Sequence, residues 1–414
     1  MTQHPGQAPD SVSVDFLARL GAAMMAANYP IALIRRTLAA AADRYGLSNQ
    51  LLLLPNFVQF GGSAHAAGTT VRVERSDADL RFDQTFPLAT LVRDVQTGRI
   101  TAPDGLAELA RIHQLAPRFR PWVTVIGYMV QSTAFALIIQ PTLPALLSAA
   151  GFGLMVGMLR LLARTSNAVQ QLLPTIASFL VALIEFSLGR VWHFSQDSVR
   201  DILAPLAVFL PGAAITLAVI DLTTREVVSG SSRLTYGLMR LAQLAFGILI
   251  AAQVVGVTTA ELNTLQFNTF GLWAPWAGVL LYACGILFYL GPPVRFLPWL
   301  MVTLLITYAS QVAANALFGN YASGFGGGLA LMLCALAISQ RPNAPPAAAL
   351  LQPGFWLLVP GSIGLIGVMQ LINTSTSASI TAMLVSMIAI ALGLQSGLLL
   401  WRGRLPLAGR TDTS

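Results

Sequence analysis

Two acidic residues lie in or beside apolar stretches of this chain, where a carboxylate is costly unless it has a function. Glu185 is inside "VALIEFSLG", and Asp221 ends "FLPGAAITLAVIDL". A carboxylate in hydrocarbon can carry a proton or pair with a cation. We therefore predict Glu185 and Asp221 as candidates for proton coupling. The alternatives are that Glu185 reaches the nearby membrane interface, and that Asp221 is a solvated helix end paired with Arg225 or Arg233.

Two Pro-Gly pairs interrupt apolar stretches in a similar setting. Proline lacks an amide hydrogen and frees the carbonyl four residues earlier, which for the first pair is that of Ala207. The N–H groups after each break lose partners that hydrocarbon cannot replace. A new helix N-terminus also favours a carboxylate. An ordinary proline kink is the alternative. We predict a solute-binding site formed by Pro211, Gly212, Ala213, Thr216, Pro360, Gly361 and Ser362.

The composition places these residues in a membrane protein. Of the 414 residues, 55% are hydrophobic and only 10% are charged, and the mean hydropathy is +0.68, whereas soluble domains have about 25% charged residues. The net charge of +7 forms no basic stripe, so we expect no nucleic-acid partner. From Pro121 onward, ten apolar runs are long enough to cross a bilayer. They cover residues 121–140, 142–162, 168–189, 199–222, 234–256, 271–290, 296–314, 321–338, 350–371 and 377–400.

The two Pro-Gly pairs fall near the midpoints of the fourth and ninth runs, which cross the bilayer in opposite directions. We therefore predict two inverted five-helix repeats, 121–256 and 271–402, in an α-helical integral membrane protein with about ten transmembrane helices. Arginines, Arg160 among them, concentrate on one side, which predicts cytoplasmic N- and C-termini. Small-residue spacings predict close helix packing at Gly153/Gly157, Gly324/Gly328 and Gly393/Gly397.

Residues 1–120 have a different character and predict a small α+β cytoplasmic domain. Amphipathic patterns predict helices over 13–28, behind a Ser13 cap, and over 30–46. The stretches "LLLLPNFVQF" and "TTVRVERS" predict a strand pair. Two further helices are expected in "FPLATLVRDVQTG" and in "TAPDGLAELARIHQLAP", the second capped by Thr101.

The order of these features resembles the threonine/serine exporter family over residues 14–400. The resemblance is carried by "DGLAELARIHQLAPRFRPW", "FLPGAAITLAVIDLTTREVVSGSSRLTYGL" and the later "VPG". It implies a cytoplasmic domain followed by ten spans in two halves, and export of small amino acids by the proton motive force. Related two-chain versions export dicarboxylates such as succinate. The chain departs from the family at "IIQPTLPAL", which lacks the acidic residue expected between the first two spans.

The resemblance implies a secondary active transporter, an antiporter that exports threonine or serine across the inner membrane. Its partners would be the solute, protons and the lipid bilayer. Both a monomer and a homo-oligomer are compatible with the sequence. We expect no enzyme activity, no cofactor and no metal, because the four histidines lack metal-ligand spacing. The alternatives are a dicarboxylate exporter and a membrane-bound hydrolase that uses Ser63 and His65 of the N-terminal domain.

Overall fold

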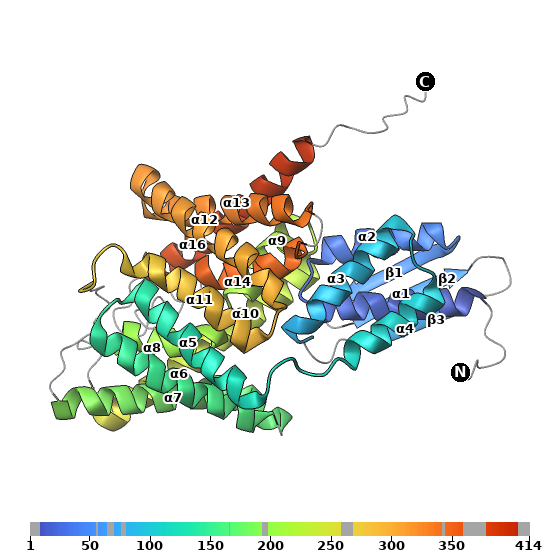
Figure 1. Ribbon diagram of the computed structural model, residues 1–414. Helices are drawn as coiled ribbons and strands as arrows, with labels where there is room; N and C mark the ends of the chain where they lie inside the picture. Colours follow the sequence, from blue (N-terminus) through green and yellow to red (C-terminus); the bar gives the residue numbers. More distant parts are fainter. Residues whose placement is uncertain are drawn as a thin grey trace. The chain divides into compact units, whose positions relative to one another are not determined.

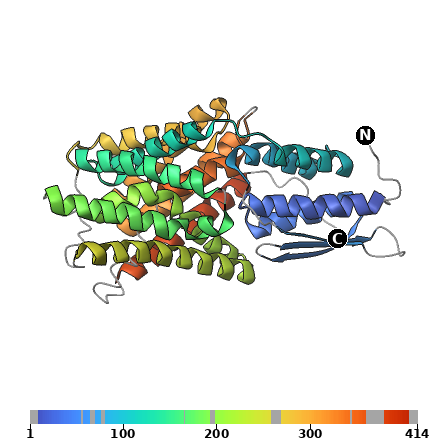
Figure 2. The ribbon, with the colours of Figure 1, turned by 90° about the horizontal axis from the view of Figure 1, so that it is seen from below.

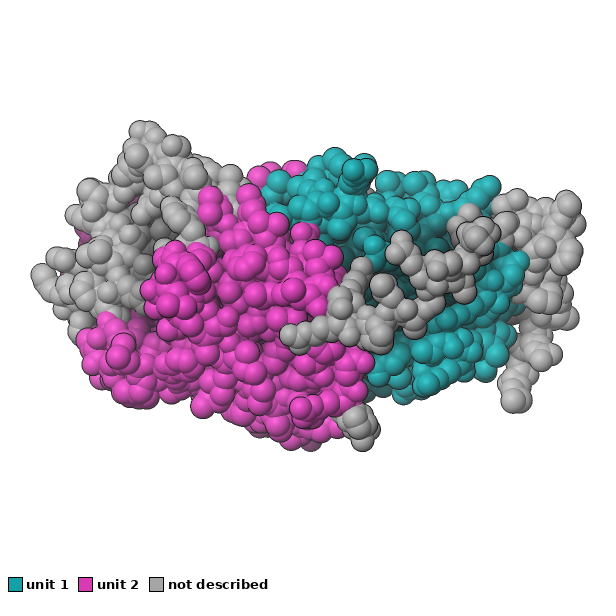
Figure 3. Space-filling view, turned by 90° about the horizontal axis from the view of Figure 1, so that it is seen from above, with its two compact units in different colours: residues 1–118, 217–234 teal, residues 119–216, 235–414 magenta. Residues whose placement is uncertain are grey.

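The computed structural model describes residues 9–54, 57–63, 70–75, 80–164, 166–192, 198–257, 268–341, 344–358 and 378–404. These residues form mainly helices and one small sheet. The chain divides into two compact units, which Figure 3 shows in two colours. Unit 1 contains residues 1–118 and 217–234, and unit 2 contains residues 119–216 and 235–414.

The sheet of unit 1 is antiparallel in the order β1-β2-β3, with strands Ser48–Leu54, Phe57–Ser63 and Thr70–Arg75. The predicted pairing is present between β2 and β3. The stretch "LLLLPNFVQF" differs from the prediction in supplying parts of two strands, β1 and β2. Leu54 pairs with Phe57, which leaves only Pro55 and Asn56 between β1 and β2. The middle strand β2 then pairs with β3.

Four helices accompany this sheet, as Figure 1 shows: α1 (Pro9–Ala26), α2 (Ile31–Arg44), α3 (Phe82–Thr97) and α4 (Ala102–His113). The core contains Phe16, Leu38 and Phe60, all fully buried. The Thr101 cap is confirmed, because its side chain accepts a hydrogen bond from the Asp104 N–H. The Ser13 cap is wrong. Helix α1 begins four residues earlier at Pro9, a residue type suited to the first helical turn.

Unit 2 is a bundle of apolar helices, seen side by side in Figure 2. Six of the described helices are long and apolar enough to cross a membrane, and the bent pair α8–α9 is a seventh candidate. The expected helical membrane protein is therefore confirmed, while the number ten stays a prediction. The helices are α5 (Pro121–Ile139), α6 (Leu143–Ala163), α7 (Asn167–Trp192), α8 (Ser198–Leu206), α9 (Gly212–Thr223), α10 (Val227–Val255), α11 (Ala274–Leu290), α12 (Leu297–Phe318), α13 (Asn320–Ser339), α14 (Ala347–Leu358) and α16 (Ala378–Arg404). The end of α9 and the start of α10 belong to unit 1.

Glycines let the backbones of α5 and α11 approach closely. A Cβ atom on Gly127 would clash with the Tyr289 nitrogen, and one on Gly285 would lie 2.8 Å from the Gln131 Cα. In a bilayer, where lipid tails are as apolar as the side chains, such close packing is a main source of helix association. Close packing of complementary surfaces therefore stabilises the contact between α5 and α11.

Candidate functional site

The chain bends at the first Pro-Gly pair. Helix α8 ends at Leu206, a 3-10 turn covers Ala207–Phe209, and α9 begins at Gly212 with its axis turned by 56°. The predicted free carbonyl of Ala207 is wrong, because the Leu210 N–H donates to it over 3.2 Å. The 3-10 turn repairs this bond locally.

The start of α9 carries the donors expected after such a break. The Ile215 N–H donates to the Pro211 carbonyl over 3.0 Å. The N–H groups of Gly212, Ala213 and Ala214 precede it and have no acceptor within the helix. Thr216 is fully buried, and its hydroxyl donates to the Gly212 carbonyl over 2.8 Å. Thr216 can therefore offer a solute only its oxygen lone pairs.

A guanidinium group lies at the bend. The Arg160 Cζ atom on α6 is 5.6 Å from the ring centre of Phe209 and 5.5 Å from that of Tyr289. Aromatic faces attract a cation at this distance. Arg160 has no ion-pair partner among the described residues. From the sequence, Arg160 is predicted only as an inside charge, although the apolar "LLA" that follows it indicates a position within the span.

Two tyrosines hold proline-containing helices in matching ways. The Tyr128 hydroxyl on α5 donates to the Pro205 carbonyl on α8 over 2.6 Å. The Tyr282 hydroxyl on α11 donates to the Pro353 carbonyl on α14 over 3.1 Å. The rings also cross-pair, since Tyr128 contacts Tyr289 and Phe135 contacts Tyr282, at centroid distances of 5.1 and 4.9 Å. Helix α5 thus bonds to α8 as α11 bonds to α14. Each of the two helices α5 and α11 also places the ring of its bonding tyrosine against an aromatic ring of the other helix.

The other predicted site residues are not gathered at this bend. Glu185 is half-buried on α7, where the Ser148 hydroxyl of α6 hydrogen-bonds to its carboxylate. Asp221 belongs to unit 1. Pro360, Gly361 and Ser362 lie outside the described residues.

Asp221 is a fully buried carboxylate with two partners in unit 1. Its Oδ2 atom is 3.2 Å from the Arg233 Nε atom, and its Oδ1 atom accepts a hydrogen bond of 3.3 Å from the Ile31 N–H. Ile31 is the first residue of α2, and the preceding Pro30 provides no side-chain cap. Asp221 therefore caps α2 from a distant part of the chain. The predicted pairing with Arg233 is present, but a solvated helix end is wrong.

Further contacts join the same two segments. The Arg35 guanidinium donates two hydrogen bonds, of 2.9 and 3.0 Å, to the Glu226 carboxylate. Arg233 also donates to the Tyr29 carbonyl over 3.2 Å. Burial raises the pKa of Tyr29 to about 12, so the phenol adds no charge here. We call this set the α2 anchor: Tyr29, Ile31, Arg35, Asp221, Glu226 and Arg233.

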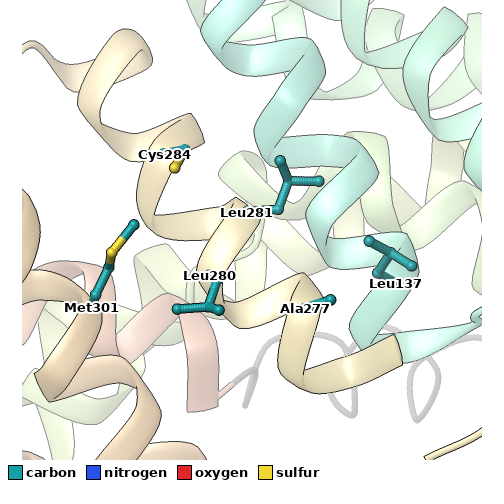
Figure 4. A pocket seen from close by; sticks show the side chains of 6 residues that line it. All are labelled: Leu137, Ala277, Leu280, Leu281, Cys284 and Met301. Carbon is teal, nitrogen blue, oxygen red and sulfur yellow. The ribbon is translucent and has the colours of Figure 1, made fainter. Parts of the chain in front are cut away.

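The cavity shown in Figure 4 offers no partner for a polar solute. It has a volume of about 510 Å³ and only apolar or thiol side chains in its lining: Leu137, Ala277, Leu280, Leu281, Cys284 and Met301. Within the described ranges, no group of three or more His, Cys, Asp or Glu residues could hold a metal ion. The polar groups at the bend are therefore the stronger candidate site.

The chain resembles known proteins over more than half of its length. A family model described as "Putative threonine/serine exporter" matches residues 15–255. Pheromone-regulated membrane protein 10 of Kluyveromyces lactis is 24% identical over 247 residues, which are 58% of this chain and 26% of that protein. An uncharacterized protein of Schizosaccharomyces pombe is 24% identical over 257 residues, 58% of this chain and 32% of that protein.

The chain thus spans only about a quarter to a third of the length of these two curated relatives. No solved structure matches it.

Proposed function

Because this chain belongs to the threonine/serine exporter family, we propose that it is a secondary active transporter that exports threonine or serine. The observation that carries the proposal is the bend at Phe209–Gly212, inside the family match, with the Arg160 guanidinium beside it. A polar solute would bind at the membrane midplane, where the interrupted helix offers polar groups that a continuous helix does not.

The solute carboxylate would bind at the start of α9. The N–H groups of Gly212 and Ala213, which have no acceptor within α9, and the positive end of the helix dipole would attract an anion. Arg160 adds a full positive charge on the neighbouring helix α6. A charge-assisted hydrogen bond contributes about 1.5–3 kcal/mol. Arg160→Met should therefore raise the KM about tenfold or more.

We further propose two inverted repeats of five spans each. The matching hydrogen bonds from Tyr128 to Pro205 and from Tyr282 to Pro353 support this proposal. The second half of the site would be Pro360, Gly361 and Ser362. Broken helices that meet from opposite directions are a recurring transporter architecture. A dicarboxylate exporter would use the same cationic groups, so the transport assay includes succinate.

Proton coupling is proposed for Glu185, the acidic residue well inside a predicted span. Its Ser148 contact supplies a neutral hydroxyl, which can hydrogen-bond to a carboxyl group in either protonation state. Glu185→Gln should abolish efflux driven by a pH gradient while solute exchange continues. Unchanged proton dependence in this variant would reject the assignment. Asp221, which is engaged with Arg233, is the weaker coupling candidate.

We also propose a location in the inner membrane with both termini in the cytoplasm, where residues 1–120 would act as a regulatory domain. The arginine distribution supports this orientation. The contacts of the α2 anchor support the regulatory role, because they tie α2 to the end of the broken helix within unit 1.

A flux measurement tests the transport proposal. The full chain is reconstituted in proteoliposomes loaded with labelled serine, threonine or succinate, and a pH gradient is imposed. We expect gradient-stimulated release of serine or threonine. Release of succinate alone would assign the dicarboxylate function, and no release of any solute would overturn the proposal.

A pair of glycine variants checks the site in the same assay. Gly212→Leu should stop efflux in a folded protein. Gly151→Leu is the matched control and should retain efflux, because a Cβ there meets no atom within 4 Å. Normal efflux in Gly212→Leu would reject the binding site at the bend.

A further inference from the structure

Two adjacent polar side chains are buried without partners in the middle of α5. Gln131 and Ser132 are each only 1% exposed. No hydrogen bond reaches Gln131 Oε1, Gln131 Nε2 or Ser132 Oγ from any described residue. Neither residue is among the site residues predicted from the sequence. Three unsatisfied polar atoms at one place are therefore a feature that needs a reason.

Neighbouring glycines fix where these two residues lie. A Cβ on Gly285 of α11 would be 2.8 Å from the Gln131 Cα, and one on Gly153 of α6 would be 2.7 Å from the Ser132 Cβ. The pair is thus enclosed where α5 crosses both α11 and α6. Neither lipid nor bulk water can supply the missing hydrogen bonds.

Other polar side chains in this bundle do find partners. Thr303 and Thr307 donate to the carbonyls of Trp299 and Thr303 within α12, and Ser310 donates to the Gly326 carbonyl on α13. These are the usual ways in which a membrane helix satisfies a hydroxyl group. Gln131 and Ser132 do neither. Hydrogen bonding between helices therefore does not explain Gln131 and Ser132. A solute that binds transiently would explain them.

The same side of α5 leads from Gln131 to the cation at the bend. Tyr128 lies one turn before Gln131, a rise of about 4.5 Å. The Tyr128 ring contacts the Tyr289 ring, over which the Arg160 guanidinium lies. A neutral donor-acceptor group and a cation therefore flank one aromatic pair. A small molecule with a hydroxyl and a carboxylate carries the complementary groups.

We propose that Gln131 and Ser132 bind the side-chain hydroxyl of the exported amino acid, an assignment that rests on the proposed transport function. A hydroxyl is both donor and acceptor, as is the Gln131 amide. A site built to bond a hydroxyl discriminates strongly against an analogue that lacks it, because its own polar groups then stay unpaired. Gln131 and Ser132 thus determine the preference for serine over alanine.

The test compares Gln131→Leu with Gln253→Leu, which makes the same change at an exposed position on α10. Each full-length variant is reconstituted, and the ratio of serine efflux to alanine efflux is measured. The Tm of the solute-free protein is measured as well. For Gln131→Leu we expect the ratio to fall at least about tenfold, equivalent to one hydrogen bond of about 1.4 kcal/mol, with an unchanged or higher Tm. Gln253→Leu should keep the wild-type ratio. Ser132→Ala should lower the ratio in the same direction.

The outcomes separate the two proposals. If wild-type protein moves no amino acid, the transport function and this assignment both fail. If wild-type protein exports serine and Gln131→Leu keeps the serine-to-alanine ratio within threefold, the assignment fails while the transport function stands. A clearly lowered Tm or an unfolded Gln131→Leu protein also overturns the assignment, because the amide then serves the fold.

Discussion

Replacing Asp221 by alanine should loosen the start of α2, although the two segments are 190 residues apart. The substitution removes the carboxylate that accepts the Ile31 N–H and faces Arg233. Both partners are poorly placed to find water, because Asp221 is fully buried and the Arg233 side chain is only 15% exposed. The change therefore removes both the cap of α2 and the carboxylate that pairs with Arg233.

The expected magnitude follows from these two losses. Breaking a buried ion pair by removing one partner costs about 3–5 kcal/mol, and the cap it contains accounts for about 1 kcal/mol of this range. The residual exposure of Arg233 favours the lower end, so we take about 3 kcal/mol. Since 1.4 kcal/mol corresponds to a factor of ten, local opening at Ile31 should become about a hundredfold more frequent.

Hydrogen exchange followed by mass spectrometry measures this opening in the full chain in detergent. Peptides that cover the start of α2 should exchange about a hundred times faster in Asp221→Ala. Asp43→Ala, at an exposed position near the other end of α2, is the matched control and should exchange like wild type. The reasoning is refuted if exchange at the start of α2 changes less than about threefold. Arg233→Met should destabilise the Asp221→Ala protein less than it destabilises the wild type, because the ion pair between the two residues is already absent in Asp221→Ala.

Three smaller effects should appear in thermal unfolding of the full chain. Arg35→Ala should destabilise the protein by at most about 1 kcal/mol, and by less at high salt. The reason is that the Arg35 and Glu226 side chains of this ion pair are 44% and 20% exposed. A larger, salt-independent loss would contradict this. Tyr128→Phe and Tyr282→Phe should each cost about 1 kcal/mol, one hydrogen bond to a carbonyl; no change in either variant would show that its bond is not formed. Gly328→Leu should cost about 1–3 kcal/mol, because a Cβ there would lie 2.6 Å from the rigid Ile390 carbonyl oxygen; wild-type stability would contradict the close packing.

Patterns governed by local chemistry were predictable from the sequence. The Thr101 cap and the helix interruption at Pro211-Gly212 follow from the residues themselves. The glycine spacings also predicted real contacts, since a Cβ on Gly393 would meet the Phe325 carbonyl and one on Gly328 would meet the Ile390 carbonyl. The cap and the interruption depend on a few neighbouring residues, so tertiary packing does not overrule them.

Features that depend on distant partners were not predictable. Asp221 has the sequence pattern of a solvated helix end, and only the fold brings Ile31 to it. Arg160 has the pattern of an inside charge until Phe209 and Tyr289 are placed around it. Gln131 stands out only when the absence of a partner among the described residues is known. A sequence gives residue types and spacing, whereas burial and pairing need the third dimension.

Unit 1 is built from two separate segments of the chain, which determines how chimeras with related proteins can be made. Because residues 217–234 belong with residues 1–118, unit 1 is not a detachable N-terminal module. A chimera that exchanges only the first 118 residues would set Ile31 and Arg35 against a foreign helical hairpin. A chimera that also transfers the hairpin would keep Asp221, Glu226 and Arg233 with their native partners. Domain swaps between family members should therefore be cut at three points in the chain, not at one.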